Sequence, residues 1–287
     1  HADFTLPNEE ERVYEALVTG VRDYVGKNNF PGVLIGVSGG IDSALTLTVA
    51  VDALGKEKVH AVMLPSRYTS DISMEDGLQL IKNLQVTQDV ISIEPAFESF
   101  LQSLEPALGN QPHDITWQNL QARTRGVIMM AISNRTGKLV LTTGNRSEMA
   151  VGYATLYGDM AGGFAVLKDI PKTMVYRLAH LRNEKNLVIP ERIITRAPTA
   201  ELAHDQKDED SLPPYDVLDK ILELYLNQEN SPQQIVESGF DEEIVTKVIS
   251  MIHRNEYKRR QSAIGPRINH KAFGRDRRYP VTSGFKK

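Results

Sequence analysis

A short apolar segment that runs into a glycine turn constrains this chain more than any other feature. Residues 33–37 read Val-Leu-Ile-Gly-Val, and Ser38-Gly39-Gly40-Ile41-Asp42-Ser43 follows at once. A helical pattern then extends from Ala44 to Leu54. A buried strand that passes through a glycine turn into a helix points several backbone N–H groups, and the positive end of the helix dipole, at one place. The sequence therefore predicts an anion-binding turn.

The residue types in this turn suit a phosphate better than a plain reversal of the chain. Gly39 and Gly40 carry no Cβ, so a ligand can come close to the backbone. Ser38 and Ser43 donate hydroxyl hydrogen bonds, and Asp42 supplies a hard oxygen ligand for Mg²⁺. No lysine follows the glycines, which excludes the GxxxxGK[ST] loop.

Strand and helix patterns alternate along the first half of the chain. Asn8 and Glu11 form a capping box that predicts a helix start, and Thr116 is the predicted cap of a later helix. Such alternation is typical of a parallel sheet covered by helices on both faces. The expected strands are 33–37, 59–64, 90–93 and 139–142, and the expected helices are 73–84, 97–104 and 116–133.

Polar clusters follow three of the expected strands. They are Ser38-Gly39-Gly40, Ser66-Arg67-Tyr68-Thr69 and Thr143-Gly144-Asn145. Ligands of open α/β sheets bind beyond the carboxyl ends of the strands. We therefore expect the three clusters to meet at one rim of the sheet.

A lysine stands at the start of a helix in the second half of the chain. Pro171 predicts the helix start and places Lys172 and Thr173 in the first turn. A positive charge there opposes the helix dipole, so a nearby anion explains Lys172 better than helix stability does. Further helices are expected at 215–226, 231–238 and 241–260.

Charge is distributed unevenly along the 287 residues. The chain carries a formal net charge of −4, yet residues 254–287 hold eleven Lys and Arg against Glu256 and Asp276. A basic tail of this kind suits either a nucleic acid or a polyanionic small substrate. The absence of cysteine excludes disulfides, thiolate metal sites and a cysteine nucleophile. No segment reads as a membrane span or a signal peptide, so we expect a cytoplasmic protein.

The Ser-Gly-Gly-Ile-Asp-Ser turn resembles the signature of the ATP pyrophosphatases, and further blocks resemble NAD synthetase within that superfamily. The match runs from about residue 10 to the C-terminus. Pro65 to Ser70 and the long tail are similar to the glutamine-using branch, although Leu156 stands where the ammonia-only branch has a lysine. The blocks are residues 143–153, 156–159, 171–173, 198–202, 208–215 and 273–280.

This resemblance implies a fold and a reaction. The fold would be a doubly wound α/β sheet of the adenine nucleotide alpha hydrolase type, with a helical C-terminal part. The reaction would convert ATP, deamido-NAD and ammonia into NAD, AMP and pyrophosphate, with Mg²⁺ and in a homodimer. In the glutamine-using branch a glutaminase half precedes this one, and the sequence leaves open whether the natural polypeptide carries it. The implied parts are a linker remnant (1–10), an ATP pyrophosphatase core (11–200), a mobile acidic loop (201–213), helices (214–260) and a basic tail (261–287).

The resemblance also assigns individual residues. The implied catalytic residues are Asp42, Glu148 and Lys172, and the metal ligands are Asp42 and Glu148. The residues implied to bind deamido-NAD are Asn119, Arg123, Glu148 and Lys258. Those implied to surround ATP are Gly36, Val37, Ser38, Gly39, Gly40, Ile41, Asp42, Ser43, Arg67, Thr143, Lys172 and Thr199.

Simpler interpretations stay open at several of these positions. Arg123 and Arg125 also fit solvated helix charges, Glu148 a helix cap, and Lys172 an ion pair with Asp169. Three other functions compete as well: a tRNA-modifying ATP pyrophosphatase, GMP synthetase, and an inactive nucleotide-binding module. The absence of cysteine and of regular aromatic residues in the tail disfavours the first, so we expect no nucleic acid partner.

Overall fold

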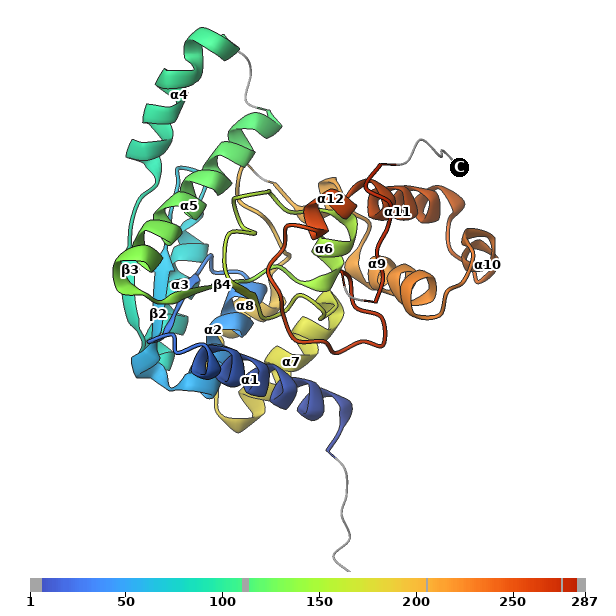
Figure 1. The fold of residues 1–287 in the computed structure, drawn as a ribbon, viewed down its shortest axis with the longest axis horizontal. Helices are drawn as coiled ribbons and strands as arrows, with labels where there is room; N and C mark the ends of the chain where they lie inside the picture. The colour runs from blue at the N-terminus through green and yellow to red at the C-terminus, as the bar shows by residue number, and fades with distance from the viewer. Residues whose placement is uncertain (1–6, 110–113, 205, 275, 283–287) are drawn as a thin grey trace, which may run out of the picture.

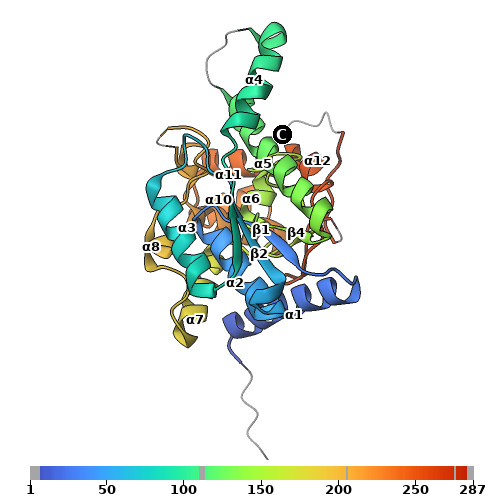
Figure 2. The same cartoon turned by 90° about the vertical axis from the view of Figure 1, so that its left-hand side faces the viewer.

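The apolar strand segments form one five-stranded parallel sheet. The computed structural model describes residues 7–109, 114–204, 206–274 and 276–282, and its sheet order is β3-β2-β1-β4-β5. Every pairing in the sheet is parallel (Figures 1 and 2). The strands are β1 (Val33–Gly36), β2 (Val59–Met63), β3 (Thr87–Val90), β4 (Leu139–Thr142) and β5 (Phe164–Ala165).

Helices cover both faces of the sheet, so the expected doubly wound fold is confirmed. On one face α1 (Glu9–Lys27), α2 (Ile41–Leu54) and α7 (Lys172–Lys185) pack on one another and on the main hydrophobic core. On the other face α5 (Ile115–Thr136) contacts β1 and β4, and a smaller apolar cluster forms around Met129. Successive residues of β1 alternate between the two clusters, which is why the whole strand is apolar.

The C-terminal helices form a second hydrophobic cluster beside the sheet. Figure 1 shows them as a lobe on the right of the molecule, with α6 between the lobe and the sheet. Helix α4 stands out from the body of the molecule in Figures 1 and 2. The remaining helices are α3 (Asp71–Leu84), α4 (Glu94–Leu108), α6 (Arg146–Val151), α8 (Glu191–Thr195), α9 (Tyr215–Leu222), α10 (Pro232–Glu237), α11 (Glu242–Arg254) and α12 (Glu256–Arg259). Short 3-10 helices lie at η1 (Lys56–Lys58) and η2 (Asp208–Asp210), and a π-helical segment, η3 (Glu223–Asn227), follows α9.

Two strands depart from the sequence prediction. The third strand lies at Thr87–Val90, not at 90–93. It is an edge strand whose four residues are all exposed, so it lacks the buried apolar run that marks the inner strands. The apolar Ile93 that suggested the later position is buried at the start of α4. Strand β5 was not predicted, since two residues after a glycine pair carry no periodic pattern.

Helix ends agree with the capping prediction at one site and contradict it at two others. Asn8 and Glu11 form the expected capping box. Helix α5 is capped by Asp114, whose side chain accepts from the N–H of Thr116, so the prediction of Thr116 as cap is wrong. The helix predicted over 241–260 breaks at Asn255, whose side chain donates to the carbonyl of Val151.

Within the ranges described above, no helix combines the length and the apolar character that crossing a bilayer requires.

Candidate active site

The glycine turn after β1 is held by its own hydroxyl groups. The N–H of Ser38 donates to Ser43 Oγ at 3.2 Å, and Ser43 Oγ donates to the Gly40 carbonyl at 2.9 Å. Gly39 has φ +80°, and a Cβ there would lie 2.3 Å from the carbonyl oxygen of Ser73. The fold therefore requires glycine at position 39. Gly40 is the N-cap of α2 and brings no side-chain hydrogen bond, so the first N–H groups of α2 stay available to a ligand.

A cavity of about 320 Å³ opens at this turn, along the carboxyl ends of the strands. Its wall includes Thr69 after β2 and Gly144 after β4, so the three predicted polar clusters meet at one rim. Residues 196–202 also line the cavity, and Arg196 joins this segment to the glycine turn through the Gly39 carbonyl. The predicted residues that line the cavity are Gly36, Val37, Ser38, Gly40, Ile41, Asp42, Ser43, Thr143, Glu148, Lys172 and Thr199.

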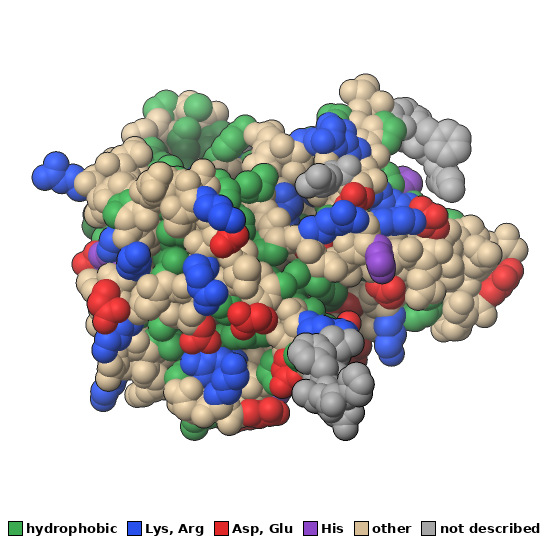
Figure 3. Space-filling view, turned by 60° about the horizontal axis from the view of Figure 1, so that its bottom comes forward, with side chains coloured by type: hydrophobic (Ala, Val, Ile, Leu, Met, Phe, Trp, Pro, Cys, Tyr) green, Lys and Arg blue, Asp and Glu red, His purple; other side chains and the backbone are tan. Residues whose placement is uncertain are grey.

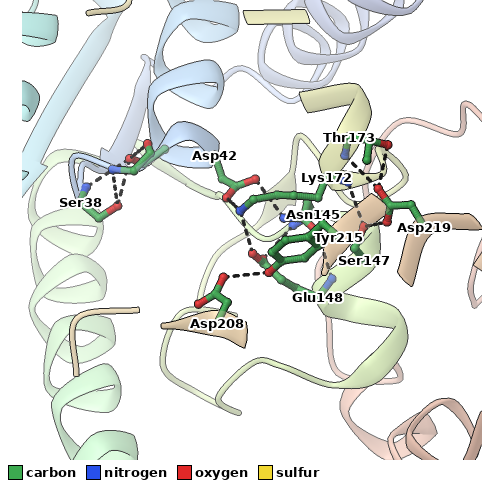
Figure 4. A network of polar contacts seen from close by, with 12 residues as sticks. Ser38, Asp42, Asn145, Ser147, Glu148, Lys172, Thr173, Asp208, Tyr215 and Asp219 are labelled. Carbon is green, nitrogen blue, oxygen red and sulfur yellow. Dashed lines mark hydrogen bonds and ion pairs between the residues drawn. The ribbon is translucent and has the colours of Figure 1, made fainter. Parts of the chain in front are cut away.

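Lys172 is the centre of the polar network in this cavity. Its Nζ donates to Asp42 Oδ2 and lies 3.4 Å from Glu148 Oε1, as Figure 4 shows. The side chain of Lys172 is only 2% exposed. Burial alone would lower the pKa of Lys172, but the charges of Asp42 and Glu148 raise it above its ordinary value. The lysine is thus a fixed cation, and the nearby anions predicted from the sequence are these two carboxylates.

Glu148 combines a structural and an electrostatic role. It completes a capping box with Asn145 at the start of α6, so the interpretation as a helix cap is also correct. Asn145 donates in turn from Nδ2 to Asp42 Oδ1 at 2.9 Å. Burial, together with the charge of Asp42, raises the pKa of Glu148 to about 8, although Lys172 opposes the shift. The site therefore holds more negative charge than it accommodates easily.

These carboxylates are suitable ligands for Mg²⁺. In the described part of the chain, no group of three or more His, Cys, Asp or Glu side chains is placed to hold a metal ion. Mg²⁺ usually takes one or two protein carboxylates and completes its shell with phosphate oxygens and water. Asp42 and Glu148 provide that number at the wall of the cavity. The donor set therefore fits a magnesium ion that arrives with a phosphate ligand.

Arg67 does not line the cavity. Its guanidinium pairs with Glu94 and with Glu98, at 2.8 Å from the latter, and its backbone N–H donates to Glu94 at 2.6 Å. These carboxylates belong to α4, a partner that the local sequence around position 67 does not reveal. The assignment of Arg67 to ATP stays a prediction that would require the side chain to turn.

Of the residues assigned to deamido-NAD, Glu148 lines this cavity, whereas Asn119, Arg123 and Lys258 lie outside it and use their polar atoms within the chain. Asn119 Oδ1 accepts from Thr155 Oγ1 at 2.9 Å, and Arg123 Nε donates to the Leu156 carbonyl at 3.1 Å. Lys258 Nζ donates to the carbonyls of Gly152 and Ala154 at 2.7 and 2.8 Å. All three contact one segment, residues 152–156, so they surround a common place.

Two arginines and an aspartate line the cavity without having been assigned to it. Arg125 donates to the Leu64 carbonyl, and burial lowers its pKa to about 10, so it is not a solvated helix charge. Arg196 donates to the Gly39 carbonyl at 3.1 Å. Asp208 is 4% exposed and accepts from Tyr215 at 2.8 Å. The two arginines contact carbonyl groups from distant segments of the chain, so the sequence near them gave no signal.

Lys172 does not pair with Asp169, which contradicts that simpler interpretation. Asp169 forms an ion pair with Arg146 at 2.8 Å, and both side chains are nearly fully buried. Asp169 also accepts from the N–H groups of Ile268 and Asn269. These contacts attach the C-terminal tail to the segment that precedes Lys172.

The cations of the tail are used largely by the protein itself. Arg259 donates to the Ala150 carbonyl, Arg277 to the Leu226 carbonyl, and Lys271 pairs with Glu229. On the face drawn in Figure 3, Lys and Arg side chains are interspersed with Asp and Glu. The positive charge of the described tail therefore has a structural explanation. The predictions for Arg275 and for residues 283–287 lie outside the described residues.

Comparison with known proteins identifies relatives of this chain. The sequence profile of the NAD synthase family matches residues 13–262. The glutamine-dependent NAD(+) synthetase of Acinetobacter baylyi is 56% identical over 276 residues, which cover 96% of this chain and 51% of that protein. The chain thus spans about half the length of the curated relatives it matches.

Solved structures show the same fold. Glutamine-dependent NAD+ synthetase from Acinetobacter baumannii, in complex with adenosine diphosphate, has a TM-score of 0.68 at 51% identity and covers 98% of this chain and 51% of that one. NMN synthetase from Francisella tularensis has a TM-score of 0.74 at 29% identity and covers 89% of this chain and 96% of that one.

Proposed function

Because the chain belongs to the NAD synthase family, we propose that it forms the amide of NAD from deamido-NAD and ammonia, and that it splits ATP into AMP and pyrophosphate. The observation that supports the proposal most is the cluster of Lys172, Asp42 and Glu148 beside the open N-terminus of α2. A fixed cation, two hard carboxylates and several free N–H groups suit a polyphosphate at one end of the cavity.

The reaction needs two displacements. A nicotinate carboxylate oxygen attacks the α-phosphorus of ATP, the bond to the β-phosphate oxygen breaks, and pyrophosphate leaves. Ammonia then attacks the carbonyl carbon, loses a proton, and expels AMP, which keeps the carboxylate oxygen. The amide therefore forms without a covalent bond to the protein.

The residues of the cavity would stabilise the charge that moves in the first displacement. The N–H groups at the start of α2 would bind the departing pyrophosphate, and Lys172 would hold negative charge close to it. The segment 196–202 forms part of the cavity wall and would limit the access of water to the adenylate. Mg²⁺, held by Asp42 and Glu148 together with the phosphates, would neutralise charge on ATP.

Deamido-NAD would bind beside residues 152–156, next to the cavity. Asn119, Arg123 and Lys258 all contact that segment, and each would exchange part of an internal hydrogen bond for a contact with the dinucleotide. Arg123 and Lys258 would provide the positive charge for its two phosphates.

A second copy of the chain would complete the assembly as a homodimer. Val127, Met130 and Tyr157 are exposed apolar side chains around a shallow hollow on α5. Exposed apolar patches of this kind commonly mark protein interfaces. Sedimentation velocity should show a dimer, and Met130→Glu should shift it towards monomer.

An isotope experiment tests the proposed reaction directly. Deamido-NAD labelled with ¹⁸O in its carboxylate should transfer one ¹⁸O to AMP when it is incubated with the chain, ATP, Mg²⁺ and ammonium. Unlabelled AMP, or ADP as product, would contradict an adenylated carboxylate.

Parallel assays of pyrophosphate release separate the competing substrates. Nicotinic acid mononucleotide tests the function that the name of the Francisella protein suggests. Xanthosine monophosphate and tRNA test the two other ATP pyrophosphatase classes. A higher kcat/KM with any of these than with deamido-NAD would replace the proposed substrate.

A further inference from the structure

The first turn of α7 lacks the features that normally stabilise a helix start. Its first residue is Lys172, whose positive charge opposes the helix dipole. Its N-cap is Pro171, which provides no side-chain hydrogen bond. The first N–H groups of a helix have no partner within the helix, and leaving them unpaired in a buried position is costly. Another part of the molecule must therefore supply an acceptor.

Asp219 supplies it from a different helix. Its Oδ2 accepts from the N–H of Thr173 at 2.9 Å and from Thr173 Oγ1 at 2.8 Å. Its Oδ1 accepts from Ser147 Oγ, and Ser147 Oγ in turn accepts from the N–H of Lys172 at 2.9 Å. Figure 4 shows these groups in one chain of contacts that ends at Lys172. The Asp219 carboxylate thus supplies the capping hydrogen bonds that the N-cap residue Pro171 cannot provide.

The same contacts join three helices. Asp219 lies on α9, Thr173 on α7 and Ser147 on α6, one residue before Glu148. Asp219 is 8% exposed, and α9 belongs to the hydrophobic cluster of the C-terminal helices. One helical turn earlier, the Tyr215 ring lies 5.1 Å from Lys172 Nζ. Helix α9 therefore contacts both ends of the lysine residue, its backbone N–H through Ser147 and its ammonium group through Tyr215.

We propose that Asp219 is a positioning residue that caps α7 from the C-terminal lobe and thereby holds Lys172 between Asp42 and Glu148. The carboxylate compensates for the unfavourable lysine at a helix N-terminus. It also fixes the start of α7 against the start of α6, so that Lys172 and Glu148 keep their separation. The effect on catalysis rests on the proposed function, whereas the positioning of Lys172 does not.

Competitive acetylation of the lysines measures this positioning without any substrate. Acetic anhydride in trace amounts, followed by mass spectrometry, gives the rate at Lys172 relative to the exposed Lys27. Asp219→Asn keeps the shape of the side chain but removes the charge and one acceptor. We expect it to raise the relative rate at Lys172 by about tenfold, since hydrogen bonds to a charged group are lost.

Asp241→Asn is the matched control. Asp241 caps α11 through the N–H groups of Glu243 and Ile244, so its replacement removes a carboxylate cap in the same lobe without touching α7. In Asp241→Asn, the acetylation rate of Lys172 relative to Lys27 should equal that of the unmodified chain. Ser147→Ala removes the hydroxyl that joins Asp219 to the Lys172 N–H and leaves the contacts of Asp219 with Thr173 in place. It serves as the second variant and should raise the rate even if Asp219→Asn does not fold.

Steady-state kinetics then test the consequence for turnover. Asp219→Asn should lower kcat by about tenfold while KM for ATP changes by less than about twofold, because the Lys172 charge acts mainly on the negative charge that develops as pyrophosphate leaves. An unchanged acetylation rate at Lys172 in folded Asp219→Asn and Ser147→Ala would overturn the proposal, and so would a raised rate with normal kcat. If no variant, nor the unmodified chain, formed NAD, the proposed function would fail while acetylation still decided the role of Asp219.

Discussion

At the scale of single residues, Asp42 has the strongest predicted effect. It is the only carboxylate of the glycine turn, and it contacts both Lys172 and Asn145. Asp42→Asn should therefore lower kcat by about 100-fold or more, as expected when a charged group that stabilises the transition state is lost. Initial rates of pyrophosphate release at saturating Mg²⁺ provide the measurement.

The control for this change is Asp71→Asn, because Asp71 is an exposed carboxylate in the first turn of the neighbouring helix α3. It should leave the rate nearly unchanged. A rate for Asp42→Asn close to that of the unmodified chain would remove Asp42 from the catalytic group.

The second prediction at this scale concerns Asp208 and the pH dependence of folding stability. Burial raises the pKa of Asp208 above its ordinary value, although the hydroxyl of Tyr215 opposes the shift. The folded chain therefore binds this proton more tightly than the unfolded chain. The stabilising contribution is complete below the unfolded pKa, near 4, and is lost as pH rises through the raised folded pKa.

Asp208→Asn should consequently gain stability relative to the unmodified chain as pH rises from about 4.5 to about 7.5. Urea unfolding at both pH values measures the difference in free energy of unfolding. Asp216→Asn, at an exposed carboxylate on α9, is the control and should show a smaller change. A difference that stays constant between the two pH values would show that the carboxyl titrates alike in both states.

The role of a residue could be predicted from the sequence where all of its contact partners lie in one short segment. The glycine turn is of this kind, since Ser38, Gly40 and Ser43 bond to one another. Arg67 was not, because its ion-pair partners Glu94 and Glu98 lie about one strand and one helix further along the chain. Nothing in the sequence near position 67 distinguishes a guanidinium directed at ATP from one directed at α4.

At the scale of elements, the sequence predicted those with a strong period and missed those fixed by tertiary contacts. Buried strands and amphipathic helices carry their own pattern, so β1, β2, β4 and α1 were placed correctly. The break between α11 and α12 has no such pattern. It follows from the contact of Asn255 with the Val151 carbonyl, which only the folded chain brings together.

The prediction at this scale concerns the packing of the C-terminal tail against the rest of the protein. Phe273 is 9% exposed, belongs to the C-terminal cluster, and has the guanidinium groups of Arg146 and Arg259 over its ring at 5.9 and 4.8 Å. Phe273→Ala should lower the free energy of unfolding by about 3 kcal/mol, the usual cost of a buried phenylalanine. Urea unfolding followed by circular dichroism measures it.

Phe100→Ala provides the comparison, because Phe100 is 42% exposed on α4. It should change the free energy of unfolding by less than about 1 kcal/mol. Equal effects of the two substitutions would mean that the tail is not part of the packed structure.

At the scale of the whole molecule, the polar network around Lys172 lies where the sheet and the C-terminal lobe meet. The glycine turn belongs to the sheet, Tyr215 and Asp219 belong to the lobe, and Lys172 contacts groups from both. The sequence indicated the sheet and its rim. It did not indicate that α9 would complete the site, because the contacts of Asp219 join segments 46 and 72 residues apart.

The nitrogen donor is the last prediction, and it concerns the chain as a whole. Glutaminases of the known amidotransferase types attack glutamine with a cysteine thiolate, and this chain contains no cysteine. The curated relatives named glutamine-dependent are about twice as long as the matched segment. We therefore expect the 287-residue chain to use ammonium salts but not glutamine. At a fixed subsaturating concentration of total ammonium, the rate of NAD formation should rise between about pH 7 and 8.5, because only the unprotonated species is a nucleophile. Glutamate released from glutamine by the purified chain, measured beside a cysteine-free control protein, would contradict this expectation.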